Sequence, residues 1–559
     1  MALVALLLGC GGGSPAAGDG GTDAMPDAGP LSPASPPVLT PCPEGWTEAP
    51  SPSGVTTCEP WSGELADCGP GLAHFPGEAG CTPVGSPCPA GDWPADLPTD
   101  GALLHVQPGS VGGDGTPGRP FGTIAEAAAG AAPGTIIALS RGVFTGNVTI
   151  GAGVALWGAC AAETTLRGVA ATPSVAFRGV GAGVELRAVR IEGPGIGVHV
   201  PMGSELRMEG VEIEGTVGGG VLVEGGDLVA MGFSIRGVRA EADGTFGRGI
   251  MVQFGGTTRV TRGSFDSNLS AAVYAVGARS SVFVDRVAIR DTQPEMASGT
   301  GGFGMWLLTQ ATAEVHASVL EGNHDVAILL LGEGTHAEVH DSVLRRTNAS
   351  RADGRFGHAV GVEHGSSADL RRTLLDENRD IALFVDDLGG SVHAEDLVVR
   401  DVRSEERSDQ YGRGINVQRQ ATFEGARVWI ERTRQLGLYF AGLGAAGTVT
   451  DLTVLDTEVQ ACAETTCADT PYGVGLGVYS GSELDLRRFA IRRSALCGVH
   501  VAEASTLSLH EGEVSEATIG ACVQIDDYDI SLLNDEVSYR DNGVNIEATS
   551  LPVPEIIGI

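Results

Sequence analysis

Two nearly identical stretches lie far apart in this chain. FGRGIMVQF begins at Phe246 and YGRGINVQR begins at Tyr411, so the separation is 165 residues, or three strides of 55. A fixed stride is typical of a chain built from stacked repeats, in which each short unit buries its apolar face only against its neighbours. The repeat therefore outweighs the length of 559 residues, which alone would favour three or four ordinary domains.

From about residue 191 the chain divides into units that each read strand, turn, strand, turn, strand. In the unit GIGVHVPMGSELRMEGVEIEG, which begins at Gly195, alternate apolar residues give each strand one inward face. The aliphatic pair of the first strand returns every 22–24 or 29–38 residues. These pairs are Val198/Val200, Val221/Val223, Ile250/Val252, Ile328/Leu330, Val360/Val362, Leu383/Val385, Ile415/Val417, Leu438/Phe440, Leu476/Val478, Val499/Val501 and Val523/Ile525.

Units this short cannot bury those faces alone, so parallel stacking around one aliphatic interior is favoured. The handedness of parallel crossovers makes the stack right-handed. We therefore predict an all-β fold, a single right-handed parallel β-helix with three strands per coil, over residues 101–559. A run of antiparallel sandwiches is the alternative, but it would not hold one register through three strands for a dozen units.

The stride of 55 residues corresponds to two coils, one short and one with an extra loop. Asn268, Asn323 and Asn378 recur at one corner, and Thr292 and Thr347 recur at the next. Asparagine tolerates the left-handed conformation and bonds its own backbone, so we assign these asparagines a structural role at the turn.

Five insertion loops end in an aromatic residue followed by glycine. We expect the aromatic residue to plug the root of each loop and the glycine to rejoin the strand, so that the loops line one edge as a polar ridge. The aromatic residues are Phe246, Phe303, Phe356, Tyr411 and Tyr472.

The segment before the first coil has its own signature. LLHVQPGSVGGDGTPGRPFGTIAEAAAGAAPGTIIALSRGVF, from Leu103, reads strand, glycine loop, helix over about residues 121–131, then the first coil. It resembles the N-terminal cap, over about residues 101–135, of the pectate-lyase-like right-handed β-helix superfamily. The resemblance implies a fold and no single activity, because the superfamily includes polysaccharide lyases, hydrolases and adhesins. Gly113–Gly118 matches G-x-G-x-x-G, but no βαβ unit follows, so no nucleotide is expected.

The N-terminus resembles a bacterial lipoprotein signal. Residues 1–9 are largely apolar and precede Cys10, which would be lipidated, and residues 10–41 form a Gly/Pro/Ser tether that cannot bury a core. We therefore expect an exported protein held at the bacterial cell envelope, on the outer membrane or cell surface, with contact to the membrane through the lipid alone. A secretory signal with an incidental cysteine is the alternative.

Ten cysteines remain once Cys10 is set aside, which fits export and disulfides. Residues 42–100 are poor in core residues and we expect disulfides to staple them. The five cysteines of this segment are Cys42, Cys58, Cys68, Cys81 and Cys88. Cys160 is the nearest partner for the odd one, Cys462 and Cys467 bracket one loop, and Cys497 and Cys522 lie about one coil apart. A zinc site is less favoured, because no C-x₂-C pair occurs.

The net charge of −35 makes nucleic acid an unsuitable partner. In polysaccharide-active relatives, catalytic acids lie on neighbouring coils. Here Glu363-His364 follows one first strand and Asp386-Asp387 the next, with Arg419 two coils from Asp386. The HG and DD dipeptides resemble polygalacturonase elements, in the reverse order.

A second group of acids could hold calcium, and no other cofactor is expected. Asp526, Asp527 and Asp529 offer carboxylate oxygens, although no EF-hand spacing is present. The remaining histidines are scattered singly and are interpreted as turn or surface residues. The favoured function is non-catalytic binding or adhesion on the cell envelope, with polysaccharide as a possible ligand. The alternative is a lyase or glycoside hydrolase acting on acidic polysaccharide at the Glu363 corner.

Overall fold

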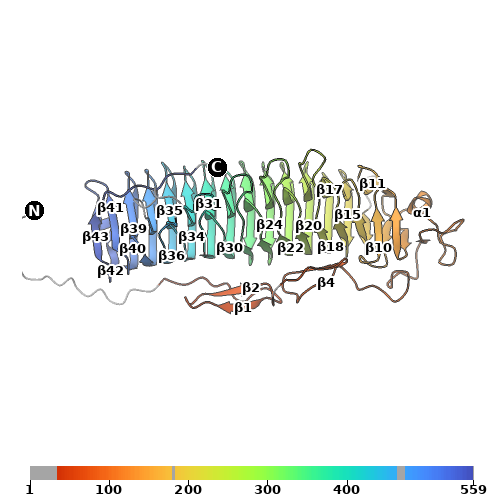
Figure 1. The fold of residues 1–559 in the computed structure, drawn as a ribbon, viewed down its shortest axis with the longest axis horizontal. Coiled ribbons are helices and arrows are strands. Elements are labelled where there is room, and N and C mark those ends of the chain that lie inside the picture. Colours follow the sequence, from red (N-terminus) through yellow and green to blue (C-terminus); the bar gives the residue numbers. More distant parts are fainter. Residues whose placement is uncertain (1–33, 64, 179–182, 462–471, 558–559) are drawn as a thin grey trace, which may run out of the picture. The chain divides into compact units, whose positions relative to one another are not determined.

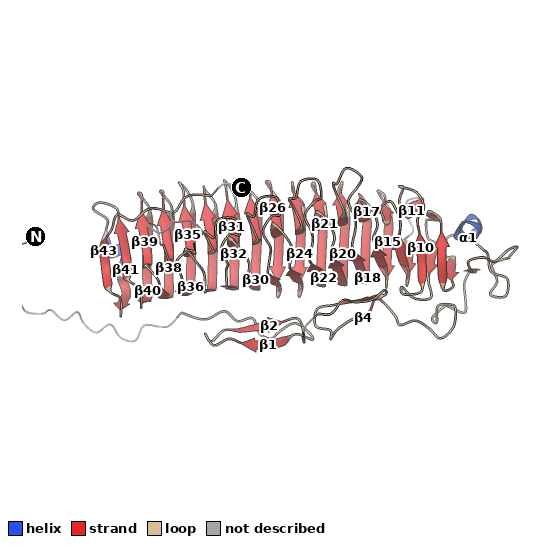
Figure 2. Ribbon diagram, viewed as in Figure 1, coloured by secondary structure: helices blue, strands red, loops and turns tan. Residues whose placement is uncertain are grey.

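The computed structural model describes residues 34–63, 65–178, 183–461 and 472–557. Parallel strands form one sheet of 23 strands and one of 16, and in both the strands stack in an order that follows the chain (Figures 1 and 2). The prediction of a right-handed parallel β-helix is confirmed. Antiparallel pairing is confined, among the described strands, to two small hairpins near the N-terminus.

The 16-stranded sheet holds the first strand of each coil. Its strands are β8 (Val148–Gly151), β11 (Val175–Arg178), β14 (Val198–Val200), β17 (Gly219–Glu224), β19 (Arg248–Gln253), β21 (Ala271–Val276), β23 (Phe303–Leu308), β26 (Val326–Leu331), β29 (His358–Glu363), β31 (Ile381–Asp386), β33 (Arg413–Gln418), β35 (Leu436–Ala441), β37 (Val474–Tyr479), β39 (Cys497–Ala502), β41 (Ile519–Gln524) and β43 (Val544–Ala548).

The 23-stranded sheet holds the other two sides of each coil. Its strands are β5 (Leu103–Val106), β6 (Ile136–Leu139), β7 (Gly142–Thr145), β9 (Ala155–Trp157), β10 (Thr164–Arg167), β12 (Val184–Arg187), β13 (Arg190–Glu192), β15 (Glu205–Glu209), β16 (Glu212–Glu214), β18 (Asp227–Arg236), β20 (Thr257–Asp266), β22 (Ser281–Arg290), β24 (Thr312–His316), β25 (Val319–Glu321), β27 (His336–His340), β28 (Val343–Arg345), β30 (Ser367–Asp376), β32 (Ser391–Arg400), β34 (Thr422–Glu431), β36 (Ala446–Thr457), β38 (Glu483–Ser494), β40 (Thr506–Ser515) and β42 (Asp535–Arg540).

The aliphatic pairs stack on their counterparts as the alternation requires. Val360 pairs with Leu383 and Leu383 with Ile415, and all three are fully buried. The last predicted pair is out of register by two residues, because Val499 and Val501 pair with Ala521 and Val523 and not with Val523 and Ile525. The short side chain of Ala521 hid the true alternation from a search for large aliphatic residues.

The asparagine corner differs from the prediction. The left-handed residues are those just before each asparagine, such as Ser267 at φ 53°. Asn268 itself is buried and bonds the preceding coil: its Oδ1 accepts from Val238 N at 3.2 Å and its Nδ2 donates to Ile235 O at 3.0 Å. Asn323 and Asn378 make the same two bonds to their own preceding coils. The asparagines therefore connect coils and do not close their own turn.

Helix α1 (Ile124–Gly130) lies where the cap was predicted and packs against β5, β6 and β8. Thr123 begins it with a capping box: the Thr123 hydroxyl accepts from Glu126 N, and the Glu126 carboxylate accepts from Thr123 N at 3.0 Å. Ile124 and Ala127 are the buried residues of this helix, so the helix covers the first coil with a small apolar face.

In four of the five insertion loops, the chain rejoins the β-helix through an aromatic residue followed by glycine, as predicted. Phe246, Phe356, Tyr411 and Tyr472 have φ between 45° and 64°, and each precedes a glycine. A Cβ on Gly247 would lie 2.6 Å from Leu269 Cβ, and the other three glycines are equally constrained. In the second loop, however, Gly301 takes the place of the aromatic residue, and Phe303 instead begins β23.

The N-terminal segment packs along the outside of the 23-stranded sheet. Strand β1 (Thr47–Pro50) pairs with β2 (Thr56–Glu59), and β3 (Leu72–Ala73) pairs with β4 (Thr82–Pro83). Residues 34–41, the end of the expected tether, already contact the β-helix. Ser35 N donates to Asp451 Oδ1 at 2.9 Å, and Val38 N donates to Asp396 Oδ1 at 2.8 Å.

Apolar residues hold this segment in place. An outward stripe of the sheet, including Val343 and Trp429, is buried beneath Leu39, Trp46 and Trp61.

The described residues form four disulfides. They are Cys42–Cys58, Cys68–Cys81, Cys88–Cys160 and Cys497–Cys522. Cys160 therefore does take the odd cysteine of the N-terminal segment, and the last pair joins β39 to β41 although the two residues are not register partners. Cys10, Cys462 and Cys467 lie outside the described residues.

Candidate functional site

The predicted carboxylate corner lies at the ends of β29 and β31. Glu363 and Asp386 are register partners in these neighbouring strands, and just beyond them His364 Nδ1 lies 3.4 Å from Asp387 Oδ2. The structure therefore brings all four predicted residues together, because one coil of stacking separates equivalent residues by one strand spacing.

Arg419 belongs to this corner directly, which corrects the prediction that it lies two coils from Asp386. Asp386 is the register partner of Gln418 in the next strand, and the adjacent Arg419 forms a forked ion pair with it, with Nε 2.7 Å from Oδ1 and a second contact from Nη2 to Oδ2. The loop between the two coils had made the sequence separation misleading. A bidentate pair of this kind holds both carboxylate oxygens of Asp386.

Glu363 is the one strongly perturbed acid of the corner. Its pKa is raised to about 7, first by burial and then by the neighbouring charges of Asp386 and Asp387, while Arg419 partly opposes them. Its exposed fraction is 4%, and that of Asp386 is 1%. The corner thus contains a protonatable carboxyl group beside a paired carboxylate, both beneath the surface.

The acids proposed for calcium are used differently. Asp529 begins a short 3₁₀ helix, η2 (Ile530–Leu533), where its carboxylate accepts from Ser531 N at 3.0 Å and from Ser531 Oγ at 2.6 Å. Within the part of the chain that the structure describes, Asp526, Asp527 and Asp529 do not converge on a common point where a cation could bind.

A second candidate site lies on the outer face of the 16-stranded sheet. Arg248, at the start of β19, has its guanidinium carbon 3.8 Å from the ring centre of Tyr274, 5.0 Å from that of Phe246 and 5.4 Å from that of Trp306. The Trp306 ring also packs at 5.0 Å against Phe303. These rings are partly exposed. We call these five residues the Arg248 patch.

Among the described residues, no carboxylate is in ion-pair contact with the Arg248 guanidinium. Its Nε reaches Ser270 Oγ at 3.5 Å, and the other polar groups that act on it are the Tyr274 hydroxyl and the more distant charge of Glu295. Burial lowers the pKa of Arg248, although the residue remains only half-buried. In a chain of net charge −35, a half-buried arginine with no carboxylate in ion-pair contact is a candidate functional residue.

Arg413 occupies the equivalent position three strides later, and here the site is filled. Its guanidinium carbon lies 4.3 Å from the Tyr439 ring centre, Nε donates to Gln435 Oε1 at 2.5 Å, and Nη1 donates to Asn416 Oδ1 at 2.8 Å. Arg413 Nη2 also donates to the backbone oxygen of Glu555 at 3.3 Å. Arg413 is fully buried as a result.

Residues 549–557 supply that cover. They form an extended segment, which we call the C-terminal strap, along the outer face of the 16-stranded sheet. Tyr439 Oη donates to Pro554 O at 3.1 Å, and Gln524 Nε2 donates to Leu551 O at 2.8 Å. Leu551 and Val553 pack against Leu436, Tyr439 and Tyr479, and Ile557 bonds Gln418.

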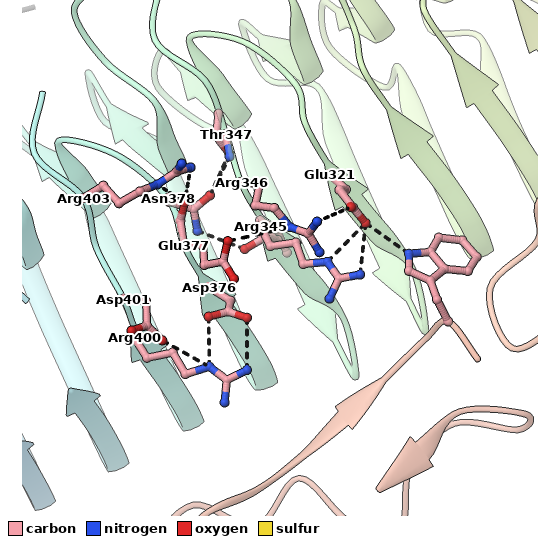
Figure 3. A network of polar contacts seen from close by, with 12 residues as sticks. Glu321, Arg345, Arg346, Thr347, Asp376, Glu377, Asn378, Arg400, Asp401 and Arg403 are labelled. Carbon is pink, nitrogen blue, oxygen red and sulfur yellow. Dashed lines mark hydrogen bonds and ion pairs between the residues drawn. The ribbon is translucent and has the colours of Figure 1, made fainter. Parts of the chain in front are cut away.

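Most other arginines are paired with acids of neighbouring coils. Figure 3 shows such a network at the edge of the 23-stranded sheet: Arg400 donates to both oxygens of Asp376 at 2.9 and 3.0 Å, and Arg345 contacts Glu321 at 3.1 Å. Glu321 also accepts from Trp61 Nε1 at 3.0 Å, so the network fastens the N-terminal segment. These arginines connect coils, whereas Arg248 is left open.

Sequence reasoning identified the carboxylate corner and missed the Arg248 patch. The aromatic residue at each loop root was seen, but the ring of Tyr274 comes from the next coil and that of Trp306 from the coil after it. The signal that could have found the patch is the residue after each loop glycine, which is Arg248, Phe303, His358 and Arg413 at intervals of 55. These four positions share one register at the same edge of the sheet.

Comparison with known proteins agrees with the fold. Residues 174–344 match a family model described as a right-handed beta helix region. No curated protein sequence matches the chain.

Similar solved structures include a pectate lyase Pel9A, with 9% identity, coverage of 83% of this chain and 81% of that chain, and a TM-score of 0.21. A periplasmic alginate epimerase AlgG has 12% identity, 68% and 75% coverage and a TM-score of 0.25. A PL6 alginate lyase in complex with a trisaccharide has 10% identity, 83% and 85% coverage and a TM-score of 0.26. The family match and the strand register make this chain a right-handed parallel β-helix protein.

Proposed function

We propose that this protein is a non-catalytic binding protein that uses the Arg248 patch to hold an acidic polysaccharide. The observation that carries the proposal is the open guanidinium of Arg248 among three aromatic rings. Aromatic faces offer flat apolar contact area to sugar rings, and the guanidinium offers directed donors to a carboxylate.

The C-terminal strap supports this assignment from within the molecule. At the equivalent position, Arg413 and Tyr439 hold an extended chain by donating to its backbone oxygens. The same combination of guanidinium and aromatic ring therefore suits a linear polymer with acceptor oxygens. Carboxylates are the acceptors that a half-exposed guanidinium prefers, which favours polyuronates over neutral glycans.

Isothermal titration against polygalacturonate, alginate, a neutral glucan and polyglutamate tests the proposal. Arg248→Ala is expected to weaken polyuronate binding at least ten-fold, a loss of about 1.4 kcal/mol or more. Arg259→Ala is the matched control, because Arg259 stacks on Phe283 at 3.8 Å on the other sheet. Unchanged binding by Arg248→Ala, or equal affinity for the neutral glucan or the peptide, would contradict the assignment.

A second candidate function rests on the carboxylate corner. A carboxyl group with a pKa near 7 beside a second carboxyl group is the arrangement used for acid–base cleavage of glycosidic bonds. In this reading Glu363 is the proton donor or acceptor, while Asp386 and Arg419 position the substrate. Release of reducing or unsaturated ends from polyuronates, lost in both Glu363→Gln and Asp386→Ala, would establish an enzyme; no release by the unmodified protein would dismiss it.

We further propose attachment to the cell envelope through lipidated Cys10. Residues 11–33, rich in glycine and proline, would space the β-helix from the membrane. No helix among the described residues is long and apolar enough to cross a membrane. Metabolic labelling with a fatty acid should mark the unmodified protein and not Cys10→Ser; equal labelling of both would refute the anchor.

A further inference from the structure

A cluster of histidines and acids lies on the outer face of the 23-stranded sheet, in strands that begin one turn after the carboxylate corner. Strand β27 reads HAEVH, and β24 in the preceding coil reads TAEVH. Because side chains alternate along a strand, His336, Glu338 and His340 all point to the outer face. Coil stacking makes Ser367 the register partner of His336 and Asp369 that of Glu338. These histidines are therefore clustered, which corrects their interpretation as scattered surface residues.

The ligand-type atoms of this cluster are close together. One nitrogen of His336 and one carboxylate oxygen each of Glu338 and Asp369 lie within 4.8 Å of one another. His336 Nε2 is 3.8 Å from Glu338 Oε1, and His340 Nε2 is 3.3 Å from Glu338 Oε2. Ligand atoms of a tetrahedral zinc ion lie ~3.3 Å apart, so small side-chain rotations bring the three groups to that spacing.

A neighbouring hydroxyl orients the imidazole. Ser367 Oγ lies 2.8 Å from His336 Nδ1. A neutral imidazole that donates its Nδ1–H to this hydroxyl carries its lone pair on Nε2, the nitrogen that faces Glu338. Such an outer partner fixes the tautomer that a metal-binding histidine needs. On the other side, the His340 ring stacks at 5.0 Å on His316 of the preceding coil, which limits its rotation.

We propose that His336, Glu338 and Asp369 bind a divalent transition-metal ion of the zinc class. Imidazole and carboxylate ligands suit zinc, whereas calcium favours a larger set of oxygen ligands. Three protein ligands leave a fourth position for water or for the nearby His340. Two other groups of potential ligands occur among the described residues, but the cysteines of both are in disulfides.

The bound ion joins neighbouring coils. His336 and Glu338 belong to β27, and Asp369 belongs to β30 of the next coil. Binding to the folded state alone raises stability by linkage, so zinc should raise the melting temperature. The site is independent of the proposed polysaccharide site, since it uses another face and other residues.

Titration of the chelator-treated full chain with Zn²⁺ alone tests the site. We expect one equivalent per chain, and at least ten-fold weaker binding in His336→Ala and in Asp369→Asn. Excess Ca²⁺ should not displace the ion. His199→Ala is the matched control, because His199 is a half-buried histidine with one carboxylate partner, Glu224, at 3.1 Å. This variant should bind Zn²⁺ with the same affinity as the unmodified protein.

Substitution by Co²⁺ adds a second readout that does not depend on affinity. Coordination by one nitrogen and two carboxylates should give visible d–d absorption that is lost in both variants. The proposal is overturned if the unmodified chain shows no saturable Zn²⁺ binding, if either folded variant still binds one equivalent with the same affinity, or if Ca²⁺ displaces the ion.

Discussion

Arg248 and Arg413 occupy the same place in the repeat, three strides apart, yet one guanidinium is half-exposed and the other is fully buried. Both follow an aromatic residue and a glycine, and both stack on a tyrosine of the next coil. They differ in what lies outside: the C-terminal strap covers Arg413, whereas the polar partners of Arg248 among the described residues are side chains of its own patch and of Ser270. The comparison indicates that one local motif is covered and well paired at β33 and half-buried and weakly paired at β19, where we propose that it binds a ligand.

The partners in the next coil explain part of this difference. Residues 270, 325, 380 and 435 face the four positions after the loop glycines. Gln435 bonds Arg413 at 2.5 Å, while Ser270 reaches Arg248 only at 3.5 Å. The Asp325 carboxylate accepts from Gly301 N at 2.6 Å, and burial raises its pKa to about 6. Where the guanidinium is well paired, as in Arg413, the arginine at this position has a structural role. Where it is weakly paired, as in Arg248, the guanidinium remains available to a ligand.

The largest expected effect is on stability at the covered position. Arg413→Leu should lower the free energy of unfolding by about 3 kcal/mol, because Gln435 and Asn416 each lose a donor while buried and the part-buried bond to the Glu555 carbonyl is lost as well. Arg248→Leu should cost less than about 1 kcal/mol, since its surroundings are half-exposed. Chemical denaturation of both variants measures the difference; equal losses would break the comparison.

The second prediction concerns Glu363, which lies between Arg248 and Arg413 in the chain. Its folded-state pKa of about 7 is raised above the ordinary value of 4.5, so the folded protein holds a proton that the unfolded chain releases. Stability is therefore complete below about pH 4.5 and falls as pH rises toward 7, by roughly 3 kcal/mol in total.

Glu363→Gln should remove most of that pH dependence and should be the more stable protein at pH 8. Chemical denaturation of both proteins at pH 5 and pH 8 measures how the free energy of unfolding depends on pH. The same pH slope in both proteins would mean that Glu363 is ionised without penalty, and the corner would then be open to solvent.

The third effect tests whether the strap occupies a binding site. A chain that ends after Ser550 should lose about 2 kcal/mol, from the packing of Leu551 and Val553 and the bonds to Tyr439 and Arg413. It should then bind polyuronate at two positions in place of one. A stoichiometry that stays at one would show that the Arg413 region lacks the shape of the Arg248 patch.

The smallest effect isolates a single hydroxyl. Tyr439→Phe removes the donor to Pro554 O and Glu555 O and should cost about 1 kcal/mol. Tyr274→Phe keeps the ring beneath Arg248 and should change stability by less than about 0.5 kcal/mol. Hydrogen exchange of the strap amides distinguishes the two, because only Tyr439→Phe should speed it. Faster exchange in both variants would indicate coupling between the regions.

The sequence determined the coil. Alternating aliphatic residues, a fixed stride and turn glycines are local features, and they predicted the sheets, the cap helix at Ile124–Gly130 and the loop roots at Phe246 and Tyr411. These local features predicted the wrong contact in two places. Ala521 was too small to be recognised as a core residue, and the asparagines form hydrogen bonds with the preceding coil and not with their own backbone. The cysteine count correctly led to Cys160 as the partner of the odd cysteine of the N-terminal segment, but only the structure shows that this cysteine is Cys88.

The tertiary structure decided which of the recurring groups are free. Arg413 is covered by Glu555, 142 residues away, and Asp386 is paired by Arg419 across a loop of variable length. The HAEVH strand becomes a cluster only because Asp369 of the next coil is its register partner. Which residues become partners depends on the lengths of all the loops between the coils. It also depends on the C-terminal strap, which runs back along the sheet. A local pattern therefore fixes which way a side chain points, while its partner depends on the assembled stack.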